Sequence, residues 1–126
     1  MRNWHIRLTS ILGLLLILSL LPTMTCSQEP QDKVIATKSI TASYVGAEIG
    51  DYNHAIFRTG DGKEIDFWCS GEMVEFLNKY KGKQIDITYQ ITDTYIPEAR
   101  RVQRIEVMKD AKVENQSFST WKKKNP

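Results

Sequence analysis

The stretch that decides the fold runs from residue 64 to residue 92 and reads EIDFWCSGEMVEFLNKYKGKQIDITYQIT. It opens with an alternating pattern in which Ile65 and Phe67 share one face, as in a half-buried strand. It closes with residues 84–92, where four apolar residues again alternate with polar ones. Residues 70–82 between them carry a helical pattern instead. The stretch therefore predicts a strand, a helix and a strand in succession.

The helix has a start signal and a stop signal. Ser70 is of the type that caps a helix N-terminus, although no Glu or Gln follows three residues later to complete a capping box. Gly82 lies just past the expected end, where a left-handed residue closes many helices. The apolar residues recur at helical spacing and form one face: Met73, Phe76, Leu77 and Tyr80.

Further strands flank this stretch on both sides. Upstream, residues 34–45 and residues 52–59 are β-like, and Gly60-Asp61-Gly62-Lys63 is a hairpin turn that joins the second run to the strand at 64–69. Downstream, residues 93–100 include Pro97 and read as a loop, and residues 101–108 form a last strand. The fold class expected is mainly β with one helix.

Five strands with a helix between the third and the fourth are the layout of the OB fold, a small Greek-key barrel. The passage Tyr80–Thr88, in which a Gly-Lys pair precedes an alternating strand, resembles the same passage of many OB domains. Together with an export signal, this layout resembles small exported bacterial OB-fold proteins over residues 34–108. The resemblance implies ligand binding on the outer face of strands 2 and 3 and in the neighbouring loops. An SH3-like barrel is the alternative, against which the full-length helix argues.

The N-terminus reads as an export signal over residues 1–27. Arg2 and Arg7 give a positive start, residues 11–21 supply 11 mostly apolar residues, and Pro22 ends the run. A membrane-spanning helix needs about 20 apolar residues, so this run fits a secretory signal better. The protein is therefore expected outside the cytoplasm, in the periplasm or cell envelope.

The rest of the chain divides into a linker at residues 28–33, an OB-like domain at 34–109 and a flexible basic tail at 110–126. Removing Arg2 and Arg7 with the signal leaves 15 Lys and Arg against 15 Asp and Glu. This near-neutral balance does not favour nucleic acid as a partner.

The fate of Cys26 depends on where the signal is cut. Cleavage after Ser27 leaves Cys69 as the one cysteine, whereas cleavage after Thr25 keeps Cys26, which could pair with Cys69. A third alternative is lipidation of Cys26, which would be the protein's membrane contact. Thr25, directly before the cysteine, departs from the usual lipobox.

The candidate ligand-binding residues follow from the expected strand register. If Ala55 and Phe57 point inward, the alternate residues of strands 2 and 3 point outward and gather aromatic and charged groups suited to stacking and ion pairing. These candidates are Tyr52, His54, Arg58, Asp66 and Trp68, joined by Tyr95, Arg100 and Arg101 from the loop at 92–101.

Two functions remain open at this point. The favoured one is a non-catalytic binding module of the cell envelope, with no cofactor, metal or catalytic residue and with a protein, a glycan or a small anionic molecule as partner. The alternative is a small metal-dependent hydrolase that uses His54, Asp66 and Glu64. Cys69 shares the face of Ile65 and Phe67, so it is expected to be a core residue rather than a nucleophile.

Overall fold

Residues 31–126 are the part of the chain that the computed structural model describes. The signal expected at residues 1–27 and the three alternatives for Cys26 lie outside the described residues. Only the end of the expected linker is described, and Lys33 already begins the first strand. Within residues 31–126, no helix combines the length and the apolarity that crossing a bilayer requires.

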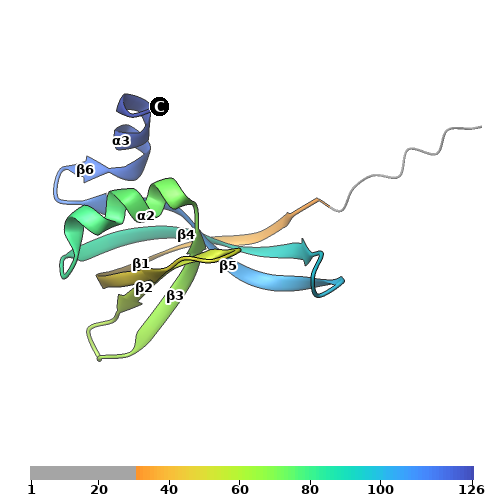
Figure 1. Cartoon of the computed structure of the whole chain (residues 1–126). Coiled ribbons are helices and arrows are strands. Elements are labelled where there is room, and N and C mark those ends of the chain that lie inside the picture. Colours follow the sequence, from red (N-terminus) through yellow and green to blue (C-terminus); the bar gives the residue numbers. More distant parts are fainter. Residues whose placement is uncertain (1–30) are drawn as a thin grey trace, which may run out of the picture.

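Six strands form one mainly antiparallel sheet. Their bounds are β1 (Lys33–Glu48), β2 (Asn53–Arg58), β3 (Glu64–Cys69), β4 (Gln84–Ile96), β5 (Arg101–Val113) and β6 (Gln116–Ser117). Their order across the sheet is β3-β2-β1-β4-β5-β6, and β3 also pairs in parallel with β5, where Trp68 lies opposite Val107. The sheet therefore curls until β3 meets β5, largely closing on itself, as Figure 1 shows.

β1 is the strand around which the sheet bends. Its first part pairs with β4, its last part pairs with β2, and Ser43 is paired on both sides. The register with β2 shifts by one residue between Tyr44 and Gly46. Such a bulge bends a strand and increases its twist, which helps one 16-residue strand to serve both halves of the sheet.

β4 and β5 are both longer than the sequence pattern predicts. The loop expected at residues 93–100 is wrong in its first half, because β4 continues to Ile96 and the connection shrinks to Pro97–Arg100. Arg100 has a φ of 51° and completes this tight turn. Antiparallel pairing up to Ile96 opposite Arg101 provides the backbone hydrogen bonds that the extra residues need. The two strands project as a ribbon, with the beginning of β1 beside them (Figure 1).

The expectation that residues 110–126 form a flexible basic tail is wrong. β5 runs to Val113, β6 pairs back with it, and helix α3 (Phe118–Lys124) follows. Phe118 and Trp121 of α3 are each only 7% exposed and pack on Phe76 of the first helix, with ring centroids 5.8 and 5.7 Å away. The sheet thus has six strands rather than five, and the described residues contain a second α-helix.

Helix α2 (Gly71–Leu77) lies where the sequence predicts a helix and continues as the 3₁₀ turn η2 (Asn78–Tyr80). The backbone N–H of Met73 donates to the hydroxyl of Ser70, which confirms the predicted cap. Gly82 has a φ of 80°, a left-handed conformation that suits glycine, and donates its N–H to the carbonyl of Tyr44. The end of the helix is therefore fixed to β1.

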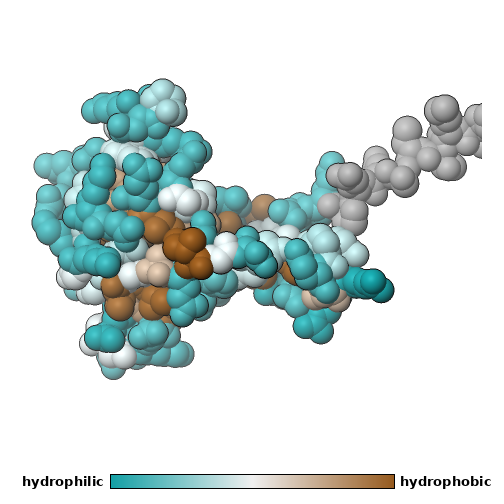
Figure 2. Space-filling model, viewed as in Figure 1, coloured by the Kyte–Doolittle hydropathy of each residue, from teal (hydrophilic) through white to brown (hydrophobic). Residues whose placement is uncertain are grey.

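One core cluster unites the sheet and the helices. It draws residues from β1 to β5, α2 and α3, including Tyr44, Phe57, Phe67, Phe76, Ile87, Met108 and Trp121. Most of the surface seen in Figure 2 is hydrophilic, and the apolar surface gathers on the main body, to the left of the centre of the view. α2 and α3 pack together on one side of the curled sheet, and the β4–β5 ribbon projects away from them.

Candidate functional site

The register of the β2–β3 hairpin is the one that the sequence predicts. Ala55 lies opposite Phe67, and both are almost completely buried, as is Phe57. On the outer face, His54 lies opposite Trp68. Because side chains alternate along a strand, the candidate residues of β2 and β3 share this outer face.

Four candidate residues form one group, which we call the outer-face cluster: Tyr52, His54, Asp66 and Trp68. The rings of Tyr52 and Trp68 lie 4.4 Å apart with 32° between their planes, and the His54 ring meets the Trp68 ring edge-on at 5.5 Å. His54 Nδ1 lies 2.9 Å from Asp66 Oδ2. Contacts on two sides thus orient the Trp68 indole and the His54 imidazole.

The cluster also reaches the turn between β4 and β5. The Tyr52 hydroxyl donates a hydrogen bond of 2.9 Å to Glu98 Oε2. This bond to a carboxylate, with partial desolvation, raises the pKa of Tyr52 above its ordinary value. The bond fixes the orientation of the Tyr52 ring and joins the two regions in which the sequence predicts binding.

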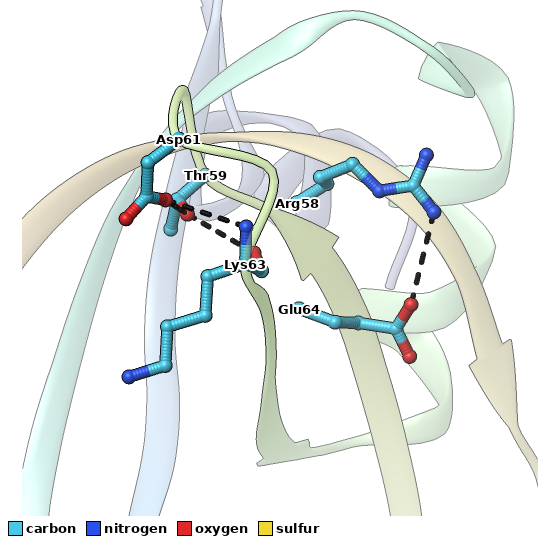
Figure 3. A network of polar contacts seen from close by, with 5 residues as sticks. All are labelled: Arg58, Thr59, Asp61, Lys63 and Glu64. Carbon is cyan, nitrogen blue, oxygen red and sulfur yellow. Dashed lines mark hydrogen bonds and ion pairs between the residues drawn. The ribbon is translucent and has the colours of Figure 1, made fainter.

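Arg58 lies at the other end of the hairpin. It faces Glu64 across the strands, with Nη2 and Oε2 3.8 Å apart, beside the turn that Figure 3 shows. In that turn the Thr59 hydroxyl donates to Asp61, and the backbone N–H of Lys63 donates to the same carboxylate oxygen. These bonds lower the pKa of Asp61. Arg58 therefore belongs to the closed end of the hairpin and not to the outer-face cluster.

The structure does not bring Tyr95, Arg100 and Arg101 into the cluster. Tyr95 is part of β4, lies opposite Val102, and faces the other side of the ribbon from Thr94. Arg100 is in the exposed turn, and Arg101 begins β5. The predicted contact region at residues 92–101 is thus largely strand, and Glu98 is the residue that links it to the cluster.

A pocket of about 290 Å³ opens beside Tyr52 and Trp68. Cys69 of β3, residues at and just before the start of β1, and side chains of β4 and β5 complete its lining. Two hydroxyls on β4, those of Thr92 and Thr94, are buried and have no hydrogen-bond partner among the described residues. Tyr52 and Trp68 of the outer-face cluster thus form one wall of a concave site.

The arrangement gives little support to metal-dependent hydrolysis. His54 and Asp66 are paired, but Glu64 contacts Arg58 instead of joining them. Within residues 31–126, no group of three or more His, Cys, Asp or Glu side chains is placed to hold a metal ion. Two groups fall short of the three protein ligands typical of a catalytic zinc site.

Cys69 lies at the end of β3 and packs against the core cluster, as the sequence predicts. Burial raises the pKa of its thiol to about 11. Reactive cysteines have lowered pKa values, so this environment is that of an inert thiol. No disulfide joins Cys69 to another residue in the described part of the chain.

Sequence reasoning missed Thr92, Thr94 and Glu98 as members of the site. The alternation that marks residues 84–92 breaks at Asp93, where an apolar residue is expected, and the available signal was the β-favouring residue types Thr92, Thr94 and Ile96. Pro97 and the polar composition of the stretch favour a loop instead.

In comparisons with protein-family models, curated proteins and solved structures, no match to this chain was found.

Proposed function

We propose that this protein is an exported, non-catalytic binding module with an OB-type barrel, and that the outer-face cluster holds its ligand. The observation that carries the proposal is the pre-oriented pair of Tyr52 and Trp68 beside the pocket. Ligand sites are typically concave, lined by aromatic and apolar side chains, and furnished with a few polar groups. Protein, glycan and small anionic ligands are the partner classes that the sequence leaves open.

The strand connections support the OB-type assignment. β1 pairs with β2 and β4, β3 pairs with β5, and α2 connects β3 to β4. OB folds are five-stranded, partly open Greek-key barrels that bind oligonucleotides and oligosaccharides on the strand 2–3 face and adjacent loops. In this chain the corresponding face carries the outer-face cluster, while β6 and α3 are additions at the C-terminal end. Export rests on the charged and apolar pattern of residues 1–27 alone.

The test is a thermal-shift screen of the purified protein with three probe classes: neutral sugars, short peptides and small organic anions. A ligand that binds only the folded state raises the melting temperature. We expect at least one class to raise the melting temperature of the wild type and to leave that of Trp68→Ala unchanged. Trp68 is only partly buried, so this variant is expected to stay folded.

Arg58→Ala is the matched control, because Arg58 is on the same hairpin and outside the cluster. It should retain the ligand response of the wild type. Equal responses of wild type and Trp68→Ala to every probe would contradict the proposal. So would a Trp68→Ala protein that loses binding only because it has lost its fold, as circular dichroism would reveal.

A further inference from the structure

The floor of the pocket beside the outer-face cluster is built from β4. This strand has β1 on one side and β5 on the other, so its backbone hydrogen bonds are already used. β4 therefore contributes only side chains to the pocket, those of Gln90, Thr92 and Thr94. No strand of a bound peptide can add to it, since strand addition needs a free edge.

The hydroxyls of Thr92 and Thr94 are the unusual groups of this floor. Thr92 is 5% exposed, and neither hydroxyl has a hydrogen-bond partner among residues 31–126. Thr92 lies between Val34 of β1 and Ile105 of β5, which are apolar and offer no partner. A buried hydroxyl without a partner costs free energy, and a ligand that bonds to it recovers that cost.

The walls of the pocket are apolar and its charges balance. Tyr52 and Trp68 provide aromatic surface, and Val107 continues the apolar wall beside Trp68. Among the lining residues, Asp32 is the one acid and Lys109 the one base. This balance does not favour a multiply charged ligand such as a nucleotide, and a purely apolar ligand would leave both Thr hydroxyls unpaired.

We propose that this pocket binds one ring of a neutral carbohydrate, an inference that rests on the binding function proposed above and names its ligand class. A pyranose ring has an apolar face of C–H groups, which can lie against Trp68 and Tyr52, and an edge of hydroxyls. Each ring hydroxyl both donates and accepts hydrogen bonds, as the hydroxyls of Thr92 and Thr94 do. The volume of about 290 Å³ lies at the small end of the range of ligand pockets.

The test uses four neutral sugars, glucose, galactose, mannose and N-acetylglucosamine, with the open-chain polyol sorbitol as a ringless control. Binding is followed by NMR, through the methyl signals of Thr92 and Thr94 and the indole N–H of Trp68. We expect at least one sugar to shift all three signals saturably, whereas sorbitol does not. Thr92→Val and Thr94→Val should each weaken that sugar about fivefold to tenfold, because each removes one hydrogen bond.

The Thr92→Val change can also be tested without ligand, by measuring the free energy of unfolding. If the Thr92 hydroxyl is unpaired, Thr92→Val leaves the free energy of unfolding unchanged or raises it, since an unsatisfied buried group is removed. Thr88→Val is the matched control, as Thr88 is on the same strand and face but outside the pocket. It should leave sugar binding at the wild-type level.

The outcomes separate this inference from the proposed function. Binding of none of the four sugars, or equal binding by sorbitol, overturns the carbohydrate assignment. Sugar binding that survives both Thr→Val changes but is lost in Trp68→Ala overturns the role of the pocket floor and keeps the outer-face cluster. If a peptide or a small organic anion is the probe that Trp68→Ala loses, the binding module stands and the ligand class is wrong.

Discussion

Trp68 and Cys69 are adjacent in β3 and differ in surroundings. Trp68 contacts the rings of Tyr52 and His54 on the outer face, while Cys69 packs against the core cluster. The thiolate is the reactive form of a cysteine, and its fraction at a given pH is set by the pKa of the thiol. The raised pKa of Cys69 therefore has a measurable consequence.

We predict that Cys69 is alkylated slowly in the folded protein. Because its pKa rises from 9.0 to about 11, its thiolate fraction at pH 8 is roughly 100-fold below that of the same thiol in the unfolded chain. The rate with iodoacetamide should rise about tenfold per pH unit up to pH 11. Peptide-resolved mass spectrometry after timed alkylation measures Cys69 separately from Cys26.

The raised pKa of Cys69 also predicts how the stability of the protein depends on pH. The folded state keeps the Cys69 proton to a higher pH than the unfolded state, so stability falls as pH rises from 9 towards 11. Alkylation of Cys69 as fast in native protein as in denaturant at pH 8 would contradict the assigned environment. Cys69→Ser, which removes this thiol, is the blank for the labelling.

At the scale of elements, α3 completes the core. Its two buried residues, Phe118 and Trp121, pack on Phe76 of α2, and Lys79 of η2 lies over the Trp121 ring at 4.8 Å. Lys122 adds an ion pair to Glu72 of α2, in which Nζ and Oε2 are 2.7 Å apart. The aromatic contacts dominate, because exposed ion pairs contribute little.

Trp121→Ala is therefore predicted to destabilise the protein by about 3–5 kcal/mol, as expected for removing a large buried aromatic side chain. Urea denaturation followed by circular dichroism measures this change. Lys123→Ala is the control in the same helix, with an exposed side chain and an expected change within about 0.5 kcal/mol. Wild-type stability of Trp121→Ala would mean that α3 does not pack on α2.

The elements also show which parts of the fold can be predicted from sequence patterns. The β2–β3 hairpin and α2 were predictable, because alternation, helical spacing and the turn glycine Gly62 are local properties. Helix α3 was not, because it has only two apolar anchors, Phe118 and Trp121, whose partner Phe76 lies some forty positions away. Packing over such separations overrides weak local preference.

The candidate site, like the fold, could be predicted only where a local sequence pattern determines it. Alternation places His54 and Trp68 on the outer face once Ala55 and Phe57 point inward, and the structure shows that these two inward residues are buried. The meeting of Tyr52 with Glu98, and the burial of Thr92, depend on how the β4–β5 ribbon lies against β3. No local pattern encodes that placement, so these members of the site appear only in three dimensions.

At the scale of the whole molecule, residues from β1 to β5, α2 and α3 share one core cluster. We therefore predict a single cooperative unfolding transition. In a thermal NMR series, the indole N–H signal of Trp121 should disappear at the same midpoint as the far-UV circular dichroism signal of the sheet. Loss of the Trp121 signal at a clearly lower temperature would show instead that α3 unfolds separately.

The ladder between β1 and β4 joins residues up to sixty positions apart, such as Lys33 and Asp93. Closing so long a loop costs chain entropy before any strand contact repays it, and proteins with many distant pairings fold in milliseconds to seconds. The hairpin and α2 can form early, because their contacts are local. The rate at which this chain assembles the pocket beside the outer-face cluster is therefore expected to depend on how quickly β1 meets β4.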